Sequence, residues 1–215
     1  MRRRLSDHRT FFQEFRRTFH TTGAVMPSGR ALCTALSRHA RNAEGPKRVL
    51  EVGPGTGVVT AHLVDAMGPG DHLDLVELND RFVARLRQRF LEDHKFQRCA
   101  GQTAILHMNV EKLSDSEPYD VVVSGLPLNN FESDEVRRIL NVLVGQLRPG
   151  GVLSFFEYIA VRRAKILLAT AADRRRLRGI AEVLGELFRG HKCRREPVWP
   201  NVPPAWVHHI WTPAD

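Results

Sequence analysis

The chain has few cysteines, and their positions argue against the sites that cysteines usually build. Cys33, Cys99 and Cys193 are odd in number, lie far apart and form no Cys-x-x-Cys pair. This usage argues against structural zinc and a disulfide framework and fits a reducing cytoplasm. The sequence also contains no recognisable Ser/His/Asp, Cys/His or metal-ligand arrangement, so neither covalent catalysis nor a metal is expected.

Long apolar runs, internal repeats and low-complexity segments are absent as well. No run approaches the roughly 20 apolar residues that span a bilayer. The basic N-terminus lacks a continuous apolar stretch, so it does not resemble a secretory signal. With 215 residues, the chain is expected to bury one substantial core.

Charges of opposite sign are separated along the chain. Residues 1–48 carry a net +8 and residues 160–196 carry +7, whereas the remaining residues carry −7. Basic segments bind the phosphates of nucleic acids or of lipids, and composition alone does not choose between them. The acidic body suits cationic ligands.

The clearest motif joins a buried strand to a helix. Apolar residues at 49–52 predict the strand, residues 58–67 predict the helix, and Glu-Val-Gly-Pro-Gly-Thr-Gly connects them at 51–57. The glycines allow a sharp turn close to a cofactor, and the helix N-terminus offers free N–H groups. The spacing differs from the dinucleotide fingerprint, so NAD or FAD is the poorer match.

This motif resembles motif I of the class I S-adenosylmethionine (SAM)-dependent methyltransferases. A strand–turn–helix corner in another α/β protein is the alternative. The resemblance implies cofactor contacts from the residues of the loop, namely Glu51, Gly53, Pro54, Gly55, Thr56 and Gly57.

Two further strands end in candidate cofactor contacts. Residues 72–76 lead to Glu77, twenty positions after Gly57, where doubly wound folds place an acid that binds the ribose hydroxyls. An exposed Glu that opens the next helix is the alternative. Residues 103–108 lead to Asn109, where the family usually carries an aspartate that receives the adenine amino group. The resemblance implies that Asn109 accepts this hydrogen bond through its carbonyl, and that Leu78 and Val110 also contact the cofactor.

The fourth predicted strand covers residues 119–124, and the loop that follows it indicates the class of substrate. Residues 124–128 resemble the Ser-Gly-Leu-Pro-Leu motif of the bacterial phospholipid N-methyltransferases, relatives of the ribosomal RNA adenine dimethylases. Adenine methyltransferases carry an Asn and an aromatic residue here to hold a flipped base. Ser124 and Leu128 replace them, so a planar base loses both contacts. We expect Ser124, Gly125 and Leu126 at the reacting site, with Ser124 also near the cofactor.

The N-terminal segment combines aromatic and basic residues. Phe11, Phe15 and Phe19 recur every four residues in a predicted helix over 2–19, with arginines away from that stripe. This pattern is typical of a helix in a membrane interface, and a helix that packs its Phe face on the domain fits equally well. The connector that follows resembles the family's cofactor-covering segment, which implies contacts from Thr22 and Met26.

The C-terminal part offers further candidates. The strand over 152–158 ends in Glu157 and Tyr158, which are expected at the mouth of the site, where they would hold an ammonium group. A solvated strand-end charge is the alternative for Glu157. Residues 160–190 predict a basic helix that faces lipid phosphate or a nucleic-acid backbone. Strands at 193–199 and 206–211 complete the sheet.

Together these features predict an α/β fold, a doubly wound, Rossmann-like, seven-stranded class I SAM-methyltransferase sheet with an N-terminal amphipathic helix. Residues 1–27 form a membrane-surface helix and a cofactor-covering connector, and residues 28–215 form the methyltransferase domain. We expect SAM as the cofactor and S-adenosylhomocysteine as its product.

The resemblance also implies a function and partners. It implies N-methylation, in successive steps, of an amine-headgroup lipid, either phosphatidylethanolamine or an aminolipid such as ornithine lipid. It places the protein in the cytoplasm, on the inner face of the membrane, held to anionic lipid through residues 2–19 and 160–196. Nucleic acid is disfavoured as a partner, and no obligate protein partner is indicated. A ribosomal RNA adenine N6-dimethyltransferase and a non-catalytic, membrane-bound SAM-fold module remain open.

Overall fold

The computed structural model describes residues 28–43, 45–113, 117–159, 171–201 and 203–214. The helix predicted over 2–19, the cofactor contacts predicted for Thr22 and Met26, and the basic residues at 160–170 lie outside the described residues.

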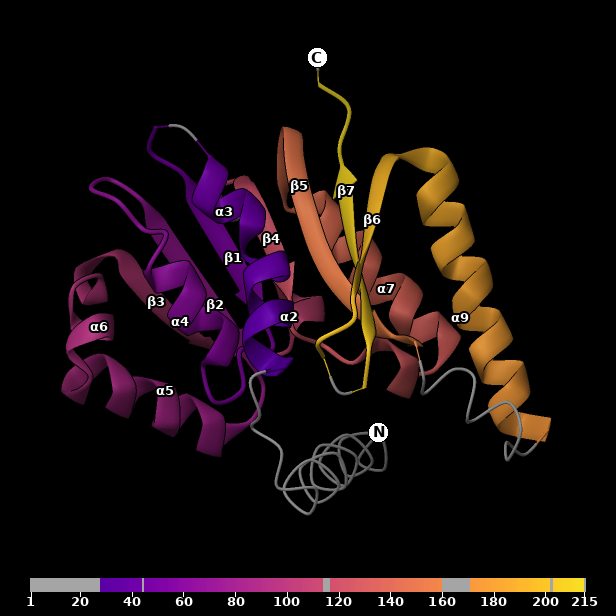
Figure 1. Ribbon diagram of the computed structural model, residues 1–215, viewed down its shortest axis with the longest axis horizontal. Coiled ribbons are helices and arrows are strands. Elements are labelled where there is room, and N and C mark those ends of the chain that lie inside the picture. Colours follow the sequence, from indigo (N-terminus) through magenta and orange to yellow (C-terminus); the bar gives the residue numbers. More distant parts are fainter. Residues whose placement is uncertain (1–27, 44, 114–116, 160–170, 202, 215) are drawn as a thin grey trace.

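The described chain forms one twisted sheet with helices on both faces (Figure 1). Its strands are β1 (Arg48–Val52), β2 (His72–Glu77), β3 (Thr103–His107), β4 (Tyr119–Ser124), β5 (Leu147–Tyr158), β6 (Lys192–Val198) and β7 (Ala205–Trp211). They lie in the order β3-β2-β1-β4-β5-β7-β6, with β7 antiparallel to both of its neighbours. The predicted seven-stranded, doubly wound sheet is confirmed.

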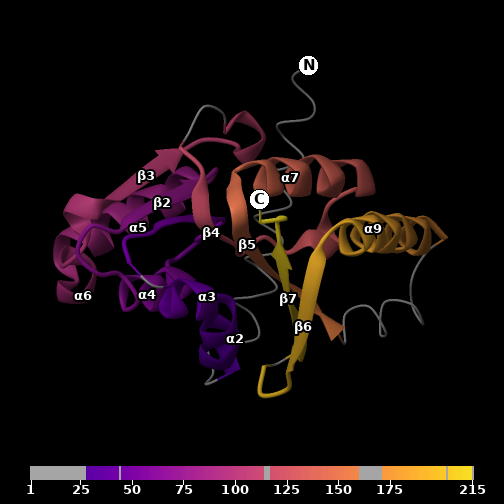
Figure 2. The same ribbon diagram turned by 90° about the horizontal axis from the view of Figure 1, so that it is seen from above.

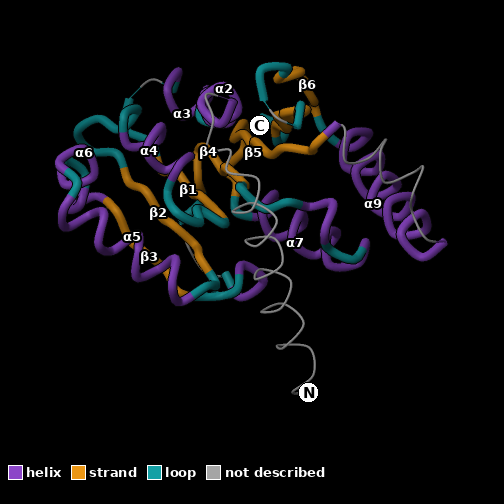
Figure 3. Tube along the Cα trace, turned by 60° about the horizontal axis from the view of Figure 1, so that its bottom comes forward, coloured by secondary structure: helices purple, strands orange, loops and turns teal. Residues whose placement is uncertain are grey.

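The strand order reverses between β1 and β4, and this reversal places the ligand site. Both strands run parallel and end at the same edge of the sheet. In open α/β sheets the loops diverge at such a switch point and leave a crevice outside the carboxyl ends of the strands. We call this side of the molecule the carboxyl edge; Figure 3 turns it toward the reader.

The helices divide between the two faces of the sheet (Figure 2). They are α2 (Ser28–Leu36), α3 (Arg38–Asn42), α4 (Val58–Val64), α5 (Asp80–Glu92), α6 (His94–Gln97), α7 (Ser133–Gly145) and α9 (Ala171–Gly190). Apolar residues of α2, α4 and α5 share one core with one face of the sheet, and those of α7 and α9 share a second core with the other face. We call these the α2 face and the α7 face. No helix in the described part of the chain is long and apolar enough to cross a bilayer.

The start of strand β5 differs from the one predicted from the sequence. The strand begins at Leu147 instead of Val152, because Leu147 pairs with Tyr119 ahead of an irregularity in the β4–β5 ladder. This difference depends on a tertiary contact that the local pattern does not encode.

A row of polar side chains links β5, β7 and β6 through close contacts on the α2 face. The Oγ of Ser154 lies 2.8 Å from Nδ1 of His209, and Nε2 of His209 lies 3.5 Å from Oε1 of Glu196. Burial, and then the neighbouring His39, lower the pKa of His209 to about 4, so its ring is neutral near pH 7. None of these residues lines the pocket described below, so the row is structural.

Candidate functional site

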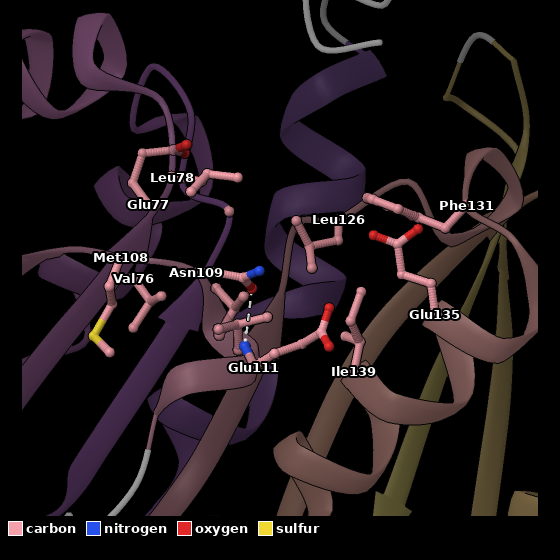
Figure 4. Close-up of a pocket in the computed structure, with 13 residues that line it drawn as sticks. Val76, Glu77, Leu78, Met108, Asn109, Glu111, Leu126, Phe131, Glu135 and Ile139 are labelled. Carbon is pink, nitrogen blue, oxygen red and sulfur yellow. Dashed lines mark hydrogen bonds between the residues drawn. The ribbon is translucent and has the colours of Figure 1, made fainter. Parts of the chain in front are cut away.

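A pocket opens at the carboxyl edge, on the α7 face of the switch point (Figure 4). Its walls come from the ends of β1, β2 and β3, the loop after β4, and the first turns of α7. The lining residues are Val52, Gly53, Val76, Glu77, Leu78, Met108, Asn109, Val110, Glu111, Leu126, Phe131, Glu135 and Ile139.

The loop over residues 53–57, which we call the glycine loop, packs tightly against the loop after β4 at Gly53 and faces open space at Gly55. A Cβ on Gly53 would lie 2.6 Å from Cδ2 of Leu126, and a Cβ on Gly125 would lie 2.6 Å from the carbonyl oxygen of Gly53. The loops after β1 and β4 therefore pack directly on each other. Gly55 has a φ of +57°, yet a Cβ there would meet no atom within 4 Å. Its side of the loop faces open space that a ligand can fill.

A long-range contact braces the same loop. Nη1 of Arg89, on α5, donates to the carbonyl oxygens of Thr56 at 3.0 Å and Gly57 at 2.9 Å. The guanidinium also lies over the ring of Phe96, 3.9 Å from its centroid. No local pattern indicates a role for Arg89, because it lies more than thirty positions from the two carbonyl groups that it binds.

Glu77 is held in place by the loops around it. Its Oε2 accepts from the backbone N–H of Gly55 at 3.0 Å, and its Oε1 accepts from that of Asn79 at 2.8 Å. Burial raises the pKa of this carboxyl, against the lowering effect of the two N–H donors. Glu77 lines the pocket, so its remaining lone pairs suit the two hydroxyls of a ribose.

Asn109 uses its carbonyl differently from the expectation. Its Oδ1 accepts from the backbone N–H of Glu111 at 2.9 Å and caps the short helix Val110–Lys112 (Figure 4). The amide nitrogen is left for the pocket, so this side chain offers a donor. An adenine ring nitrogen is the matching acceptor, in place of the amino group we expected.

Several pocket residues were missed by the sequence analysis. Met108 precedes Asn109, and Phe131 follows the loop after β4. Glu135 and Ile139 lie one turn apart on α7, and Figure 4 shows both beside the pocket. The apolar stripe of α7 signals that Ile139 is buried, but only the crossover to the α7 face brings it to the cofactor side.

Glu51 is the most unusual group near the site. It is fully buried at the end of β1, and neither carboxylate oxygen has a hydrogen-bond partner among the described residues. Burial raises its pKa to about 8, against the lowering effect of the neighbouring Thr60, and the Glu77 carboxylate raises it further. On the α2 face, burial and then Glu51 raise the pKa of the Cys33 thiol to about 11. An unpartnered buried carboxylate fits a ligand ammonium group, which would satisfy and neutralise it.

Glu157 and Tyr158 do not face one common mouth, which corrects our expectation. Adjacent residues of a strand point to opposite faces. Oε2 of Glu157 lies 3.4 Å from Nε2 of His208, and the ring of His208 stacks on Phe155. Tyr158 instead packs with the core of the α2 face, where burial, followed by Cys33, raises its pKa to about 12. Only Tyr158 shares a face with Glu51.

Ser124 also lies differently from the expectation. Its side chain is fully buried, and its Oγ accepts from the backbone N–H of Leu126 at 3.3 Å. The hydroxyl therefore shapes the loop after β4 and does not line the pocket. Leu126 does line the pocket, and Leu128 is buried with 3% exposure.

The residues present fit SAM. The pocket on the α7 face offers Glu77 for the ribose and apolar side chains for the adenine. The open side of Gly55 and the unpartnered Glu51 suit the amino-acid end on the α2 face. In the described residues, no group of His, Cys, Asp and Glu side chains is arranged to hold a metal ion.

Comparisons with known proteins agree with this geometry. A family model described as "Methyltransferase domain" matches residues 49–151. An ornithine lipid N-methyltransferase of Singulisphaera acidiphila is 30% identical over 111 residues, which cover 52% of this chain and 57% of that protein. A ribosomal RNA small subunit methyltransferase A of a Synechococcus strain is 39% identical over 82 residues, which cover 38% of this chain and 28% of that protein.

A solved structure shows how far the likeness in fold extends. The N-methyltransferase NodS of Bradyrhizobium japonicum, in complex with S-adenosylhomocysteine, superposes with a TM-score of 0.64 at 20% identity. The match covers 88% of this chain and 89% of that one. By contrast, the chain spans 57% or less of the length of the two curated relatives. The fold is that of the class I SAM-dependent methyltransferases, and SAM is the cofactor of this fold.

Proposed function

We propose that this SAM-dependent methyltransferase domain methylates the amine of a membrane lipid headgroup, in successive steps. The headgroup is that of phosphatidylethanolamine or of an aminolipid such as ornithine lipid. The similarity to an ornithine lipid N-methyltransferase supports this substrate class. The protein would act from the cytoplasm, at the inner face of the membrane.

The observation that carries the proposal is the loop after β4. Recognition of a flipped base needs an amide or carboxylate acceptor and an aromatic face at this loop. Here Ser124 turns its hydroxyl into the loop, and Leu128 is buried with no ring to offer. Positions 124 and 128 therefore lack the two contacts that adenine methyltransferases make to a base, whereas a small aliphatic amine needs neither.

The chain's own residues supply binding and orientation. SAM supplies the methyl group, carried on a sulfonium that an amine attacks directly. Glu77 would hold the ribose, Leu78 and Val110 the adenine, and Glu51 the ammonium of the amino-acid end. These contacts would orient SAM for transfer to an amine that arrives neutral and in line at the loop after β4. Its proton then leaves to water.

The runner-up is methylation of adenine in ribosomal RNA. The similarity to ribosomal RNA methyltransferases and the two basic segments favour it. A binding module without catalysis is the third candidate.

Labelled SAM distinguishes the three candidates. The full chain is incubated with detergent-dispersed phosphatidylethanolamine or ornithine lipid, or with ribosomal RNA, and the label is followed into each acceptor. We expect label in an amine lipid and none in RNA. Label in RNA alone would reject the lipid substrate, and no label in any acceptor, with SAM still bound, would favour the binding module.

A further inference from the structure

One exposed aromatic side chain is left unexplained by the cofactor site. Among the described residues, the large apolar side chains that are exposed are Val58, Leu78, Leu91 and Trp199, with Trp199 64% exposed. Leu78 lines the cofactor pocket, and Val58 begins α4 directly after the glycine loop. Trp199 belongs to neither feature, although exposing an indole to water is costly.

Trp199 lies at the carboxyl edge, where substrates enter. It follows the last residue of β6, Val198, whose partner on β7 is Ala205. Ala205 pairs in turn with Tyr158 at the end of β5, and the N–H of Ile159 donates to the carbonyl oxygen of Pro204 at 2.8 Å. Figure 1 shows this tip of the β6–β7 hairpin at the same side of the sheet as the start of α2.

The tip is stiff. Prolines at 200, 203 and 204 fix their backbone φ angles. Asn201 is buried, and its Nδ2 donates to the carbonyl oxygen of Pro203 at 2.8 Å. Restriction of the backbone beside a side chain lowers the conformational entropy that is lost when that side chain binds.

The strand that leads to the tip exposes positive charge. Lys192, Arg194 and Arg195 are exposed on β6, which is the edge strand of the sheet. The guanidinium of Arg195 lies over the ring of Trp206, 4.2 Å from its centroid. The one carboxylate of the strand, Glu196, is paired with Arg38 at 2.9 Å. Cations beside tryptophans are typical of surfaces that rest in the headgroup layer of a bilayer.

We propose that the β6–β7 hairpin docks the protein on an anionic bilayer. Trp199 enters the headgroup layer, and Arg195 contacts lipid phosphates. The carboxyl edge, with the mouth of the site, then faces the layer that holds the lipid amines. This inference rests on the proposed function, because only a lipid substrate requires that orientation.

Fluorescence of Trp199 tests the contact directly. In the full chain, Trp206→Phe together with Trp211→Phe leaves Trp199 as the only tryptophan. The probe is a vesicle of phosphatidylcholine and phosphatidylglycerol with brominated acyl chains. We expect a blue shift and quenching of the emission when the protein binds. Unchanged emission from protein that sediments with the vesicles would overturn the inference, as would a failure to bind.

A matched pair of variants measures the contribution to affinity. Trp199→Ala should weaken vesicle binding at least about fivefold, because an indole loses its burial in the interface. Trp211→Phe, at the opposite end of β7 beside Lys192, should leave binding unchanged. Both variants should keep the unfolding temperature of the parent within a few degrees. Equal vesicle affinities would overturn the inference.

Two further measurements separate this inference from the proposed function. Trp199→Ala should methylate detergent-dispersed lipid as the parent does, and vesicle lipid more slowly. If the protein methylates detergent-dispersed lipid but the Trp199 emission does not respond to vesicles, only the docking surface is rejected. If no lipid is methylated in any form, the proposed function is rejected. Quenching of Trp199 by single-stranded RNA and not by vesicles would assign the hairpin to nucleic acid.

Discussion

At the scale of single residues, Glu51 links the electrostatics of the site to pH. Its pKa of about 8 lies above the ordinary value of 4.5, because burial of the carboxyl outweighs the lowering effect of the neighbouring Thr60. Between these two values the folded protein keeps a proton that the unfolded chain has released. The free energy of unfolding therefore falls as the pH rises through this window. A bound ammonium would relieve this loss by stabilising the ionised carboxylate.

Replacing Glu51 by Gln should remove this dependence. Without SAM, the unfolding temperature of Glu51→Gln should change less between about pH 5 and about pH 8 than that of the parent. Its affinity for SAM near neutral pH should fall about tenfold or more, because a charge-assisted contact is lost. Thermal melts and calorimetric titration measure the two quantities, and Glu92→Gln on the exposed side of α5 is the control. An unchanged SAM affinity would exclude Glu51 from the cofactor site.

The glycines allow a second comparison between matched residues. Gly55 and Gly45 both have positive φ, at +57° and +71°, and a Cβ on either would meet no atom within 4 Å. Alanine at either position should therefore cost about 1–2 kcal/mol of stability. Only Gly55→Ala places a methyl group in the space we assign to SAM, so it alone should lose SAM binding by more than tenfold. Equal SAM affinities of the two variants would mean that the cofactor does not approach Gly55.

At the scale of elements, the sheet was predictable and the pairing of side chains across it was not. Apolar runs ending in glycine or an acid located β1 and β2 within one residue. The expectation for Glu157 and Tyr158 was wrong, because it placed adjacent strand residues on one side. The role expected for Ser124 stays a prediction, and the structure adds that its hydroxyl accepts a hydrogen bond within its own loop.

The helix predicted over residues 2–19 stays a prediction, and one variant tests it. If its Phe face rests on lipid, Phe15→Glu should weaken vesicle binding several-fold and leave SAM affinity intact, because a charge enters the apolar interface. Phe15→Leu, which keeps the face apolar, is the control. Unchanged vesicle binding, or a lower unfolding temperature, would mean that the face packs on the domain.

At the scale of the whole molecule, charge is separated in a way that favours anionic surfaces. Residues 1–48 and 160–196 carry the positive charge, and the remaining residues are net negative. The exposed cations of β6 belong to the second basic segment and lie on the edge strand of the sheet. The acidic pocket residues Glu77, at the end of β2, and Glu111, after β3, lie on the other side of the switch point.

Raising the ionic strength should therefore weaken binding to vesicles without changing the rate of methyl transfer. Binding to phosphatidylglycerol vesicles should weaken several-fold as the ionic strength rises from about 0.05 M to about 0.3 M, because exposed charges are screened. Methyl transfer to detergent-dispersed lipid should change little over the same range. Sedimentation and label incorporation measure the two effects. Vesicle binding that ignores salt would contradict the electrostatic part of the proposal.

The sequence by itself determined the strands, the glycine loop and the acid at the end of β2. Each of these depends on neighbours within a few positions, such as an apolar run or a turn that needs positive φ. The residues from Gly53 to Gly57 and Glu77 could be assigned because loops after parallel strands meet at one edge.

Only the tertiary structure decided which groups meet across the fold. Arg89 bracing the glycine loop, Ile139 lining the pocket, and Trp199 standing exposed beside the end of β5 all depend on contacts between distant segments. The register of the strands and the crossovers of the helices fix these contacts, and neither leaves a local pattern. The unpartnered burial of Glu51 is of the same kind, because α2, α4 and the sheet must all pack before water is excluded from it.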